Sequence, residues 1–164
     1  MKTTILTSYF VVDLKGNIKI RDDLKLRVQK ISPKAKVPVR AHETDAGIDI
    51  YSINAETIPP GSRRVLPTGI KVAVPEGWAL ILKDKSGLAV NNGVHIMAGV
   101  IDSEYRGELG VVIVNLSKER LDIVEGQKIA QGLLVPVGLF DIQEVSSLEN
   151  TTRGDGGFGS TGLS

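Results

Sequence analysis

The chain contains no cysteine and only two histidines among its 164 residues. The absence of cysteine excludes disulfide bonds, zinc–thiolate sites and thiol catalysis. The two histidines, His42 and His95, lie far apart in the sequence. A histidine-based metal site or a catalytic triad therefore has little support in this sequence.

The sequence also lacks an excess of charge, because 20 lysines and arginines stand against 19 aspartates and glutamates. Binding to a nucleic-acid backbone or to an anionic membrane needs a positive excess, so neither partner is expected. No stretch approaches the roughly 18 apolar residues of a membrane-spanning helix, and no cleavage-like site follows the N-terminus. We expect a soluble cytoplasmic protein, in which any phosphate chemistry comes from a local site.

Short apolar segments of the β type are abundant. The segment Ile70–Val74 alternates with a period of two, whereas Trp78–Leu82 and Val111–Val114 are short buried runs. Turn sequences rich in proline, glycine and asparagine separate such segments, which favours a single all-β domain, a sandwich or barrel. Helical turns are expected only at residues 86–91 and 146–150.

The sequence divides into three parts. Residues 1–23 form an N-terminal extension that we predict to be a β-hairpin, with Phe10–Asp13 and Ile18–Ile20 on either side of the turn Lys15–Asn17. Its function is not indicated beyond an added sheet edge or a contact surface. Residues 24–152 form the main β domain, and residues 153–164 form a C-terminal tail.

The tail places five glycines around Phe158, with Arg153 before the ring and two hydroxyl residues, Ser160 and Thr161, after it. Ordering the backbone of a residue costs about 1–2 kcal/mol, and glycine loses the most freedom. We therefore expect a flexible tail that closes only over a ligand with a ring to stack on and charge to bind, such as a nucleoside phosphate. The match of Gly154–Gly159 to a dinucleotide-binding fingerprint is rejected, because that motif must follow a strand and open a helix.

Four internal segments carry more polar chemistry than a β-sandwich needs. The first, Thr44–Ile50, has two carboxylates four residues apart, and the second, Lys85–Ala89, has a cation and a hydroxyl at an expected helix start. The third, Gly99–Gly107, is hairpin-like, with a carboxylate and an aromatic residue three apart at its tip. The fourth is Gly126–Gln131. A helix start with free N–H groups is a ready site for an anion.

These four segments and the tail, in this order, resemble the five motifs of the trimeric dUTP diphosphatases (dUTPases), over roughly residues 24–164. The resemblance implies a jelly-roll-like all-β subunit with a flexible glycine-rich tail, and a homotrimer with active sites shared between subunits. It also implies hydrolysis of dUTP to dUMP and pyrophosphate with Mg²⁺, which limits uracil incorporation into DNA and supplies dUMP for dTMP synthesis.

The resemblance assigns the chemistry at the base and the sugar. Asp102 would be the catalytic base that orients and deprotonates the attacking water, since an aspartate of ordinary pKa near 3.9 is ionised at pH 7. Tyr105 would pack against the deoxyribose. Backbone groups around Ile96–Val100, with Gly99, Val100 and Ile101 in the substrate site, would read the uracil edge and exclude the thymine methyl group.

The resemblance also assigns the residues that bind phosphate. Lys85, Ser86, Gly87 and Gln131 would contact phosphate oxygens, and Asp49 would orient polar groups or metal-bound water, with a structural salt bridge as its alternative. An N-cap role is the alternative for Ser86, and a solvent-facing strand position for Gln131. Mg²⁺ would be held mainly by the triphosphate and water, with no direct protein ligand.

In the tail, the resemblance makes residues 153–164 a lid over the active site. The residues expected to contact substrate there are Arg153, Phe158, Gly159, Ser160 and Thr161. Some positions depart from the family pattern: Lys85 replaces an arginine, Gln127–Lys128 replaces an Asp-Arg pair and puts an ion pair in doubt, and Gly132 replaces a bulky residue. A dCTP deaminase of the same fold group and a regulatory binding protein on the same scaffold remain alternatives.

Overall fold

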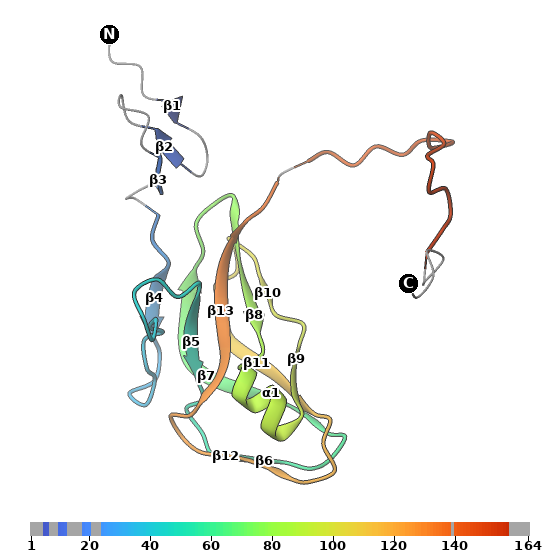
Figure 1. Ribbon diagram of the computed structural model, residues 1–164. Helices are drawn as coiled ribbons and strands as arrows, with labels where there is room; N and C mark the ends of the chain where they lie inside the picture. Colours follow the sequence, from blue (N-terminus) through green and yellow to red (C-terminus); the bar gives the residue numbers. More distant parts are fainter. Residues whose placement is uncertain (1–4, 7–9, 13–17, 21–23, 139, 158–164) are drawn as a thin grey trace.

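The computed structural model describes residues 5–6, 10–12, 18–20, 24–138 and 140–157 (Figure 1). Two four-stranded antiparallel sheets form the body of the domain. The first sheet has the order β10-β8-β13-β5, from strands β5 (Gly47–Tyr51), β8 (Trp78–Lys83), β10 (Val100–Ile101) and β13 (Lys128–Pro136). The second has the order β4-β7-β11-β9, from strands β4 (Arg27–Lys30), β7 (Arg63–Ala73), β9 (Val94–Met97) and β11 (Glu108–Asn115).

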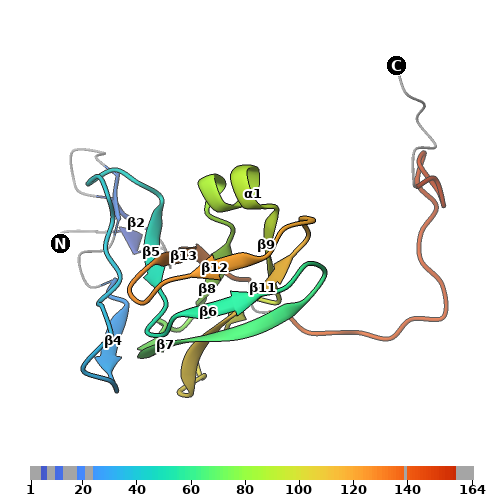
Figure 2. The same cartoon turned by 90° about the horizontal axis from the view of Figure 1, so that it is seen from below.

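Two smaller sheets complete the fold. Strands β6 (Glu56–Ile58) and β12 (Leu121–Ile123) pair at one end of the domain (Figure 2). Near the N-terminus, β2 (Phe10–Val12) pairs antiparallel with β3 (Ile18–Ile20) and with a short strand β1 (Ile5–Leu6). The turn predicted at Lys15–Asn17 lies outside the described residues.

The core lies between the two large sheets. Strand β11 has one buried face, because its residues from Leu109 onward alternate between buried and half-buried positions. Leu109, Val111 and Ile113 face inward, into this core. Ile50, Leu80 and other aliphatic side chains of the facing sheet are equally buried. The all-β, jelly-roll-like fold class predicted from the sequence is confirmed.

The strands predicted at Ile70–Val74, Trp78–Leu82 and Val111–Val114 lie within β7, β8 and β11. The helical turn at residues 86–91 is also confirmed, as α1 (Ser86–Asn92). The helical turn predicted at residues 146–150 is wrong, because this segment is irregular and exposed. So short a helix is marginal in water, and here no packing partner stabilises it.

The prediction of a hairpin at Gly99–Gly107 is also wrong. Strand β10 does not pair with the strands on either side of it in the sequence, because Val100 and Ile101 pair with Ile81 and Leu80 of β8. Strands β9 and β11 pair with each other in the other sheet. The chain therefore crosses from one sheet to the other between β9 and β10, at Ala98 and Gly99, which both have positive φ.

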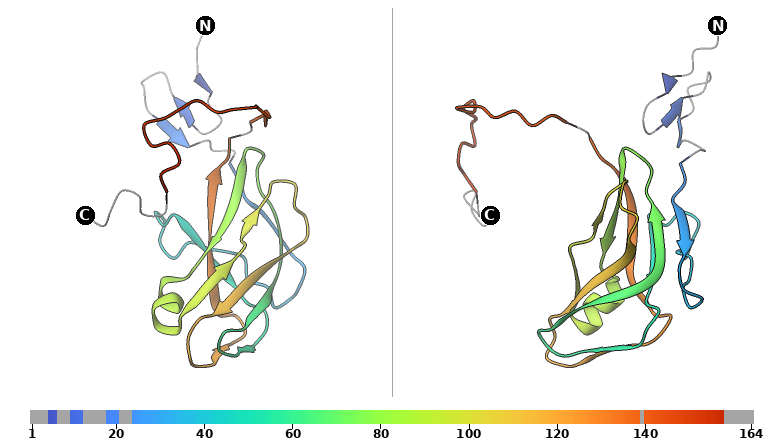
Figure 3. Two further views of the ribbon diagram at one scale, coloured as in Figure 1. Left: turned by 90° about the vertical axis from the view of Figure 1, so that its right-hand side faces the viewer. Right: turned by 180° about the vertical axis from the view of Figure 1, so that it is seen from behind.

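Beyond β13, residues 137–138 and 140–157 leave the body of the domain as an extended arm (Figures 1 and 3). The arm has no regular secondary structure within its described residues. Across the described ranges, no helix combines the length and the apolar character needed to cross a membrane.

Candidate active site

A buried carboxylate with two lysines forms one part of the site. Asp49 lies on β5, and its two carboxylate oxygens are 2.6 Å from the Nζ atoms of Lys85 and Lys128. The side chain of Asp49 is only 5% exposed, so the two ammonium groups compensate for its loss of hydration. The Gln127–Lys128 sequence put an intersubunit or local ion pair in doubt, and within the chain Lys128 does form a local ion pair, with Asp49.

The pKa values of this cluster follow from the contacts. Burial raises the pKa of Asp49, but the contacts with Lys128 and Lys85 outweigh burial and hold it below the ordinary value of 3.8. The same contact with Asp49 raises the pKa of Lys128 above 10.5. Asp49 and Lys128 are thus both charged at neutral pH, and the cluster holds two lysines against one carboxylate.

The residues after Lys85 open α1. Lys85 occupies the N-cap position in extended conformation, and no side chain caps the helix. Ser86 is the first helical residue, so the alternative of an N-cap serine does not hold. Its hydroxyl and the N–H groups of the first turn have no intrahelical partner, which leaves them available to an oxygen ligand.

Gln131 lies on β13 directly between Asp49 of β5 and Lys83 of β8. Residues directly opposite one another share a face of the sheet, so these three side chains project together. The Gln131 Nε2 group donates a 2.9 Å hydrogen bond to the carbonyl of Asp84, and the side chain is half-buried. The alternative of a solvent-facing strand residue is therefore wrong, because the amide is anchored at the start of α1.

The crossing between the sheets lines a cavity of about 250 Å³. Gly99 has a φ of 101°, and its carbonyl accepts a 2.8 Å hydrogen bond from the Leu82 N–H of β8. The structure brings the predicted residues of the third segment together here; the cavity is lined by Met97, Ala98, Gly99, Val100, Ile101, Asp102, Tyr105, Gly110 and Val112. Backbone groups of an edge strand and an aromatic ring thus surround one space that is large enough to admit a pyrimidine base.

Asp102 and Tyr105 lie in the turn between β10 and β11, where the Tyr105 N–H bonds the Asp102 carbonyl at 3.2 Å. Within the described residues, the Asp102 carboxylate has no hydrogen bond or ion pair and is exposed, so it does not cap the turn. Tyr105 is 44% exposed, lies over Gly107, and donates its hydroxyl to the Glu108 carbonyl at 2.9 Å. Tyr105 is therefore not an ordinary core tyrosine. Its hydroxyl is held by a main-chain carbonyl, and its side chain lines the same cavity as Asp102.

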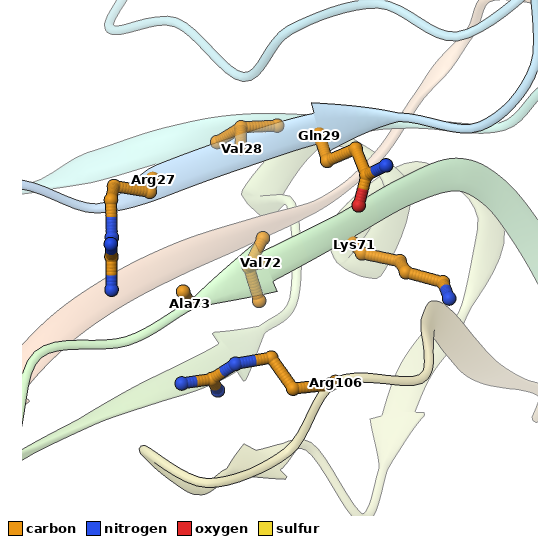
Figure 4. A pocket seen from close by; sticks show the side chains of 7 residues that line it. All are labelled: Arg27, Val28, Gln29, Lys71, Val72, Ala73 and Arg106. Atoms are coloured by element: carbon orange, nitrogen blue, oxygen red, sulfur yellow. The ribbon is translucent and has the colours of Figure 1, made fainter.

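Positive charge gathers next to this turn. Arg27 and Lys71 project from β4 and β7 into a cavity of about 370 Å³, and Figure 4 shows the guanidinium groups of Arg27 and Arg106 converging beside Ala73. Arg106 is fixed by hydrogen bonds from Nη1 to the carbonyls of Ser103 and Tyr105. Arg27 and Arg106 also line a larger cavity together with Asp102 and two further acidic residues, Glu76 and Glu104.

The tail is described only in part. Arg153 is exposed and donates from Nε to the Gly156 carbonyl at 2.8 Å, within a local turn. The predicted substrate contacts of Phe158, Gly159, Ser160 and Thr161 lie outside the described residues.

The predicted residues form two groups that one chain does not bring together. Helix α1, next to Asp49 and Gln131, and the segment between β10 and β11 lie at opposite ends of the domain in Figures 1, 2 and 3. No described contact joins Asp102 to Ser86 or Gln131.

Comparison with known proteins decides between the possible families. A family model described as dUTPase matches residues 33–162. The chain belongs to the dUTPase family. The deoxyuridine 5′-triphosphate nucleotidohydrolase of Clostridium novyi is 42% identical over 142 residues, which cover 85% of this chain and 100% of that protein. The protein of the same name from Rattus norvegicus is 40% identical over 151 residues, which cover 92% of this chain and 74% of that protein.

Solved structures of dUTPases share the fold. The dUTPase of Staphylococcus bacteriophage 80alpha with dUPNHPP superposes with a TM-score of 0.78 at 31% identity and covers 85% of this chain and 99% of that one. A mutant dUTPase from phage phi11 of S. aureus superposes with a TM-score of 0.71 at 30% identity, covering 77% of this chain and 99% of that one. Coordination of a structural Mg(II) ion is described for the phi11 protein.

The side chains near this site indicate how a dUTPase of this sequence would hold a metal ion. In the ranges that the structure describes, no group of three or more histidine or acidic side chains could hold a metal ion. Asp49 is held by two ammonium groups, so its oxygens are not open to a cation. These residues fit an ion that arrives on the triphosphate rather than one bound in a protein cage.

Sequence reasoning missed several residues of this dUTPase site. Lys128 was noted only as a departure from the family pattern, and Arg27 and Arg106 follow no motif that signals a pocket. Asp84 and His95 were not singled out as a pair, although they lie 2.9 Å apart at the edge of the site. No local pattern could reveal that contact, because it depends on how β8 and β9 meet.

Proposed function

We propose that this chain hydrolyses dUTP to dUMP and pyrophosphate by attack of water on the α-phosphorus, with Asp102 as the base. One observation carries the proposal: an exposed carboxylate, which has no hydrogen bond or ion pair among the described residues, lines the same cavity as a tyrosine whose hydroxyl is held by a main-chain carbonyl. An ionised aspartate can take a proton from water, and a positioned base typically contributes about 10²–10⁴ in rate.

The same cavity accounts for the choice of base and sugar. Backbone groups of residues 96–100 would bond the uracil edge, and the close wall formed by Gly99 on Leu82 would exclude a methyl group at the ring. Such exclusion is needed, because the loss of one favourable methyl contact is worth only about 1–3 kcal/mol. The Tyr105 ring would pack against the deoxyribose, where a 2′-hydroxyl would collide with it.

The phosphates would bind at Ser86, Gly87 and Gln131, next to the excess positive charge of the Asp49 cluster. Lys85 contacts Asp49 in the free chain, so we infer that its first role is to hold this carboxylate and that its charge acts on phosphate from there. Bound with the triphosphate, Mg²⁺ would supply charge neutralisation at the phosphate oxygens. Arg153 and Phe158 of the tail would close over phosphate and base.

We infer that the chain acts as a homotrimer in the cytoplasm. The arrangement supports the shared site, because the phosphate-binding residues of one copy can meet Asp102 only in another copy. The N-terminal extension, residues 1–23, the domain, residues 24–152, and the lid, residues 153–164, keep separate roles in this proposal.

The test is pyrophosphate release from dUTP, dTTP, dCTP and UTP, with ammonia release from dCTP as the assay for a deaminase. We expect release from dUTP alone. Asp102→Asn should lose about 10²–10⁴ in kcat while nucleotide affinity changes only a few fold. Glu104→Gln, in the same turn, is the matched control and should keep normal turnover. Normal turnover in Asp102→Asn would overturn the assignment of the base.

A further inference from the structure

Strand β9 lies at the edge of its sheet, and a side chain of the other sheet closes that edge. Among the described strands, only β11 lies beside β9, so alternate N–H groups of β9 have no partner in another described strand. The Ile96 N–H, one of these, donates a 2.7 Å hydrogen bond to Oδ1 of Asp84. Asp84 directly follows β8, so its carboxylate ties the two sheets together at the point where residues 96–101 begin.

The second oxygen of this carboxylate is also held. Asp84 Oδ2 lies 2.9 Å from Nδ1 of His95, and the Asp84 side chain is 30% exposed. Burial raises the pKa of Asp84, but the hydrogen bonds from His95 and the Ile96 N–H, with the charges of His95 and Lys83, hold it below 3.8. The carboxylate is therefore ionised at neutral pH and accepts strong, charge-assisted hydrogen bonds.

The main chain of Asp84 is engaged as well. Its carbonyl accepts the Gln131 side-chain bond, and the next residue, Lys85, contacts Asp49. Further along the same strand, the Leu82 N–H bonds the Gly99 carbonyl. The segment from Ile96 to Gly99 is thus attached to β8 at both ends, by the Asp84 side chain at one end and by a main-chain bond at the other.

We propose that Asp84 is a positioning residue for base selection: its carboxylate fixes the start of the segment 96–101 that reads the uracil, and His95 fixes the carboxylate. This inference rests on the proposed function. Asp84 touches no substrate and acts through the Ile96 main chain. Without the carboxylate, the Ile96 N–H would lose its partner, and the start of the segment would no longer be joined to the end of β8, although β9 would still pair with β11 and β10 with β8.

Asp84→Ala and Asp84→Asn test the role together. Asp84→Ala should lower kcat/KM for dUTP about tenfold, because small displacements at a site are costly. It should also reduce the ratio of kcat/KM for dUTP to that for dTTP. Asp84→Asn should largely restore both quantities, because its Oδ1 can still accept from the Ile96 N–H and its amide can still hydrogen-bond the His95 ring.

A matched control lies outside the site. Asp122 of β12 accepts a hydrogen bond from the Thr57 hydroxyl on one oxygen and contacts Arg120 on the other, much as Asp84 is engaged. Asp122→Ala should leave the dUTP to dTTP ratio within about twofold. A change in this control equal to that in Asp84→Ala would mean that selectivity reports only general stability, and would overturn the inference.

Amide hydrogen exchange gives a readout that needs no nucleotide. The Ile96 amide should exchange about tenfold faster in Asp84→Ala than in the unaltered chain, and Asp122→Ala should leave it unchanged. If the unaltered chain hydrolyses no nucleotide, the proposed function fails, while amide exchange still tests the hydrogen bond between Asp84 and the Ile96 N–H. If the chain hydrolyses dUTP and Asp84→Ala keeps full selectivity or normal exchange at Ile96, the inference is wrong.

Discussion

At the scale of single residues, the Asp49 cluster makes stability depend on pH in a defined direction. The folded pKa of Asp49 lies below 3.8, so its contribution to the free energy of unfolding is present above that pH. The contribution is lost as the pH falls through the folded pKa. Lys128→Met removes one of the two ammonium groups and raises the folded pKa of Asp49. We therefore expect the acid-unfolding midpoint of Lys128→Met to lie at a higher pH than that of the unaltered chain.

The measurement is circular dichroism or Trp78 fluorescence from pH 7 to pH 3, with Lys34→Met as control. Lys34 also forms an ion pair, at 2.8 Å with Glu125, but both side chains are about half exposed. Exposed pairs contribute roughly 0–1 kcal/mol, so Lys34→Met should follow the unaltered profile closely. Identical acid profiles for Lys128→Met and the unaltered chain would show that Lys128 does not lower the folded pKa of Asp49, and would contradict this prediction.

At the scale of elements, the crossing from β9 to β10 depends on Gly99. Its φ of 101° is costly for any residue with a Cβ, and an added Cβ would lie 3.1 Å from both Cβ and the carbonyl oxygen of Leu82. Gly77 has a φ of 77° and no atom within 4 Å of an added Cβ. Gly77→Ala should therefore lower the free energy of unfolding only by the cost of placing a residue with a Cβ at positive φ, about 1–2 kcal/mol.

Gly99→Ala should lose more stability than Gly77→Ala and should also raise KM for dUTP, because Val100 and Ile101 must shift away from β8. Chemical denaturation gives the stability of each variant, and steady-state pyrophosphate release gives the kinetics. Equal KM values in the two variants would show that the conformation of this crossing does not affect nucleotide binding.

The same elements show what the sequence can predict. The strand runs and the turn with Asp102 and Tyr105 are local patterns, and the structure places them as expected. Strand partners are not local: β10 pairs with β8 because of long-range packing, so a hairpin was the natural but wrong expectation. The Asp84–His95 contact is of the same kind, since it joins an edge strand of one sheet to the end of a strand in the other.

At the scale of the whole molecule, the arm after β13 carries apolar side chains that one copy does not bury. Phe140, Ile142 and Leu148 are each more than 80% exposed, with Ile142 at 90%. Exposed apolar residues along an arm that leaves the domain indicate a protein contact. A second copy is the partner that fits, because the two halves of the proposed site also meet only between copies. We expect the arm to pack on a neighbouring copy in the homotrimer.

Ile142→Asp should therefore dissociate the assembly, since it places an unpaired charge in a buried contact. Val90→Asp is the matched control, because Val90 on α1 is 83% exposed but belongs to the body of the domain. Light scattering after gel filtration should report a trimer for the unaltered chain and for Val90→Asp, and smaller species for Ile142→Asp. Pyrophosphate release should fall in parallel, because a lone copy holds Asp102 and Ser86 at opposite ends. A trimeric Ile142→Asp would contradict the role of the arm, whereas a fully active monomer would contradict the shared site as well.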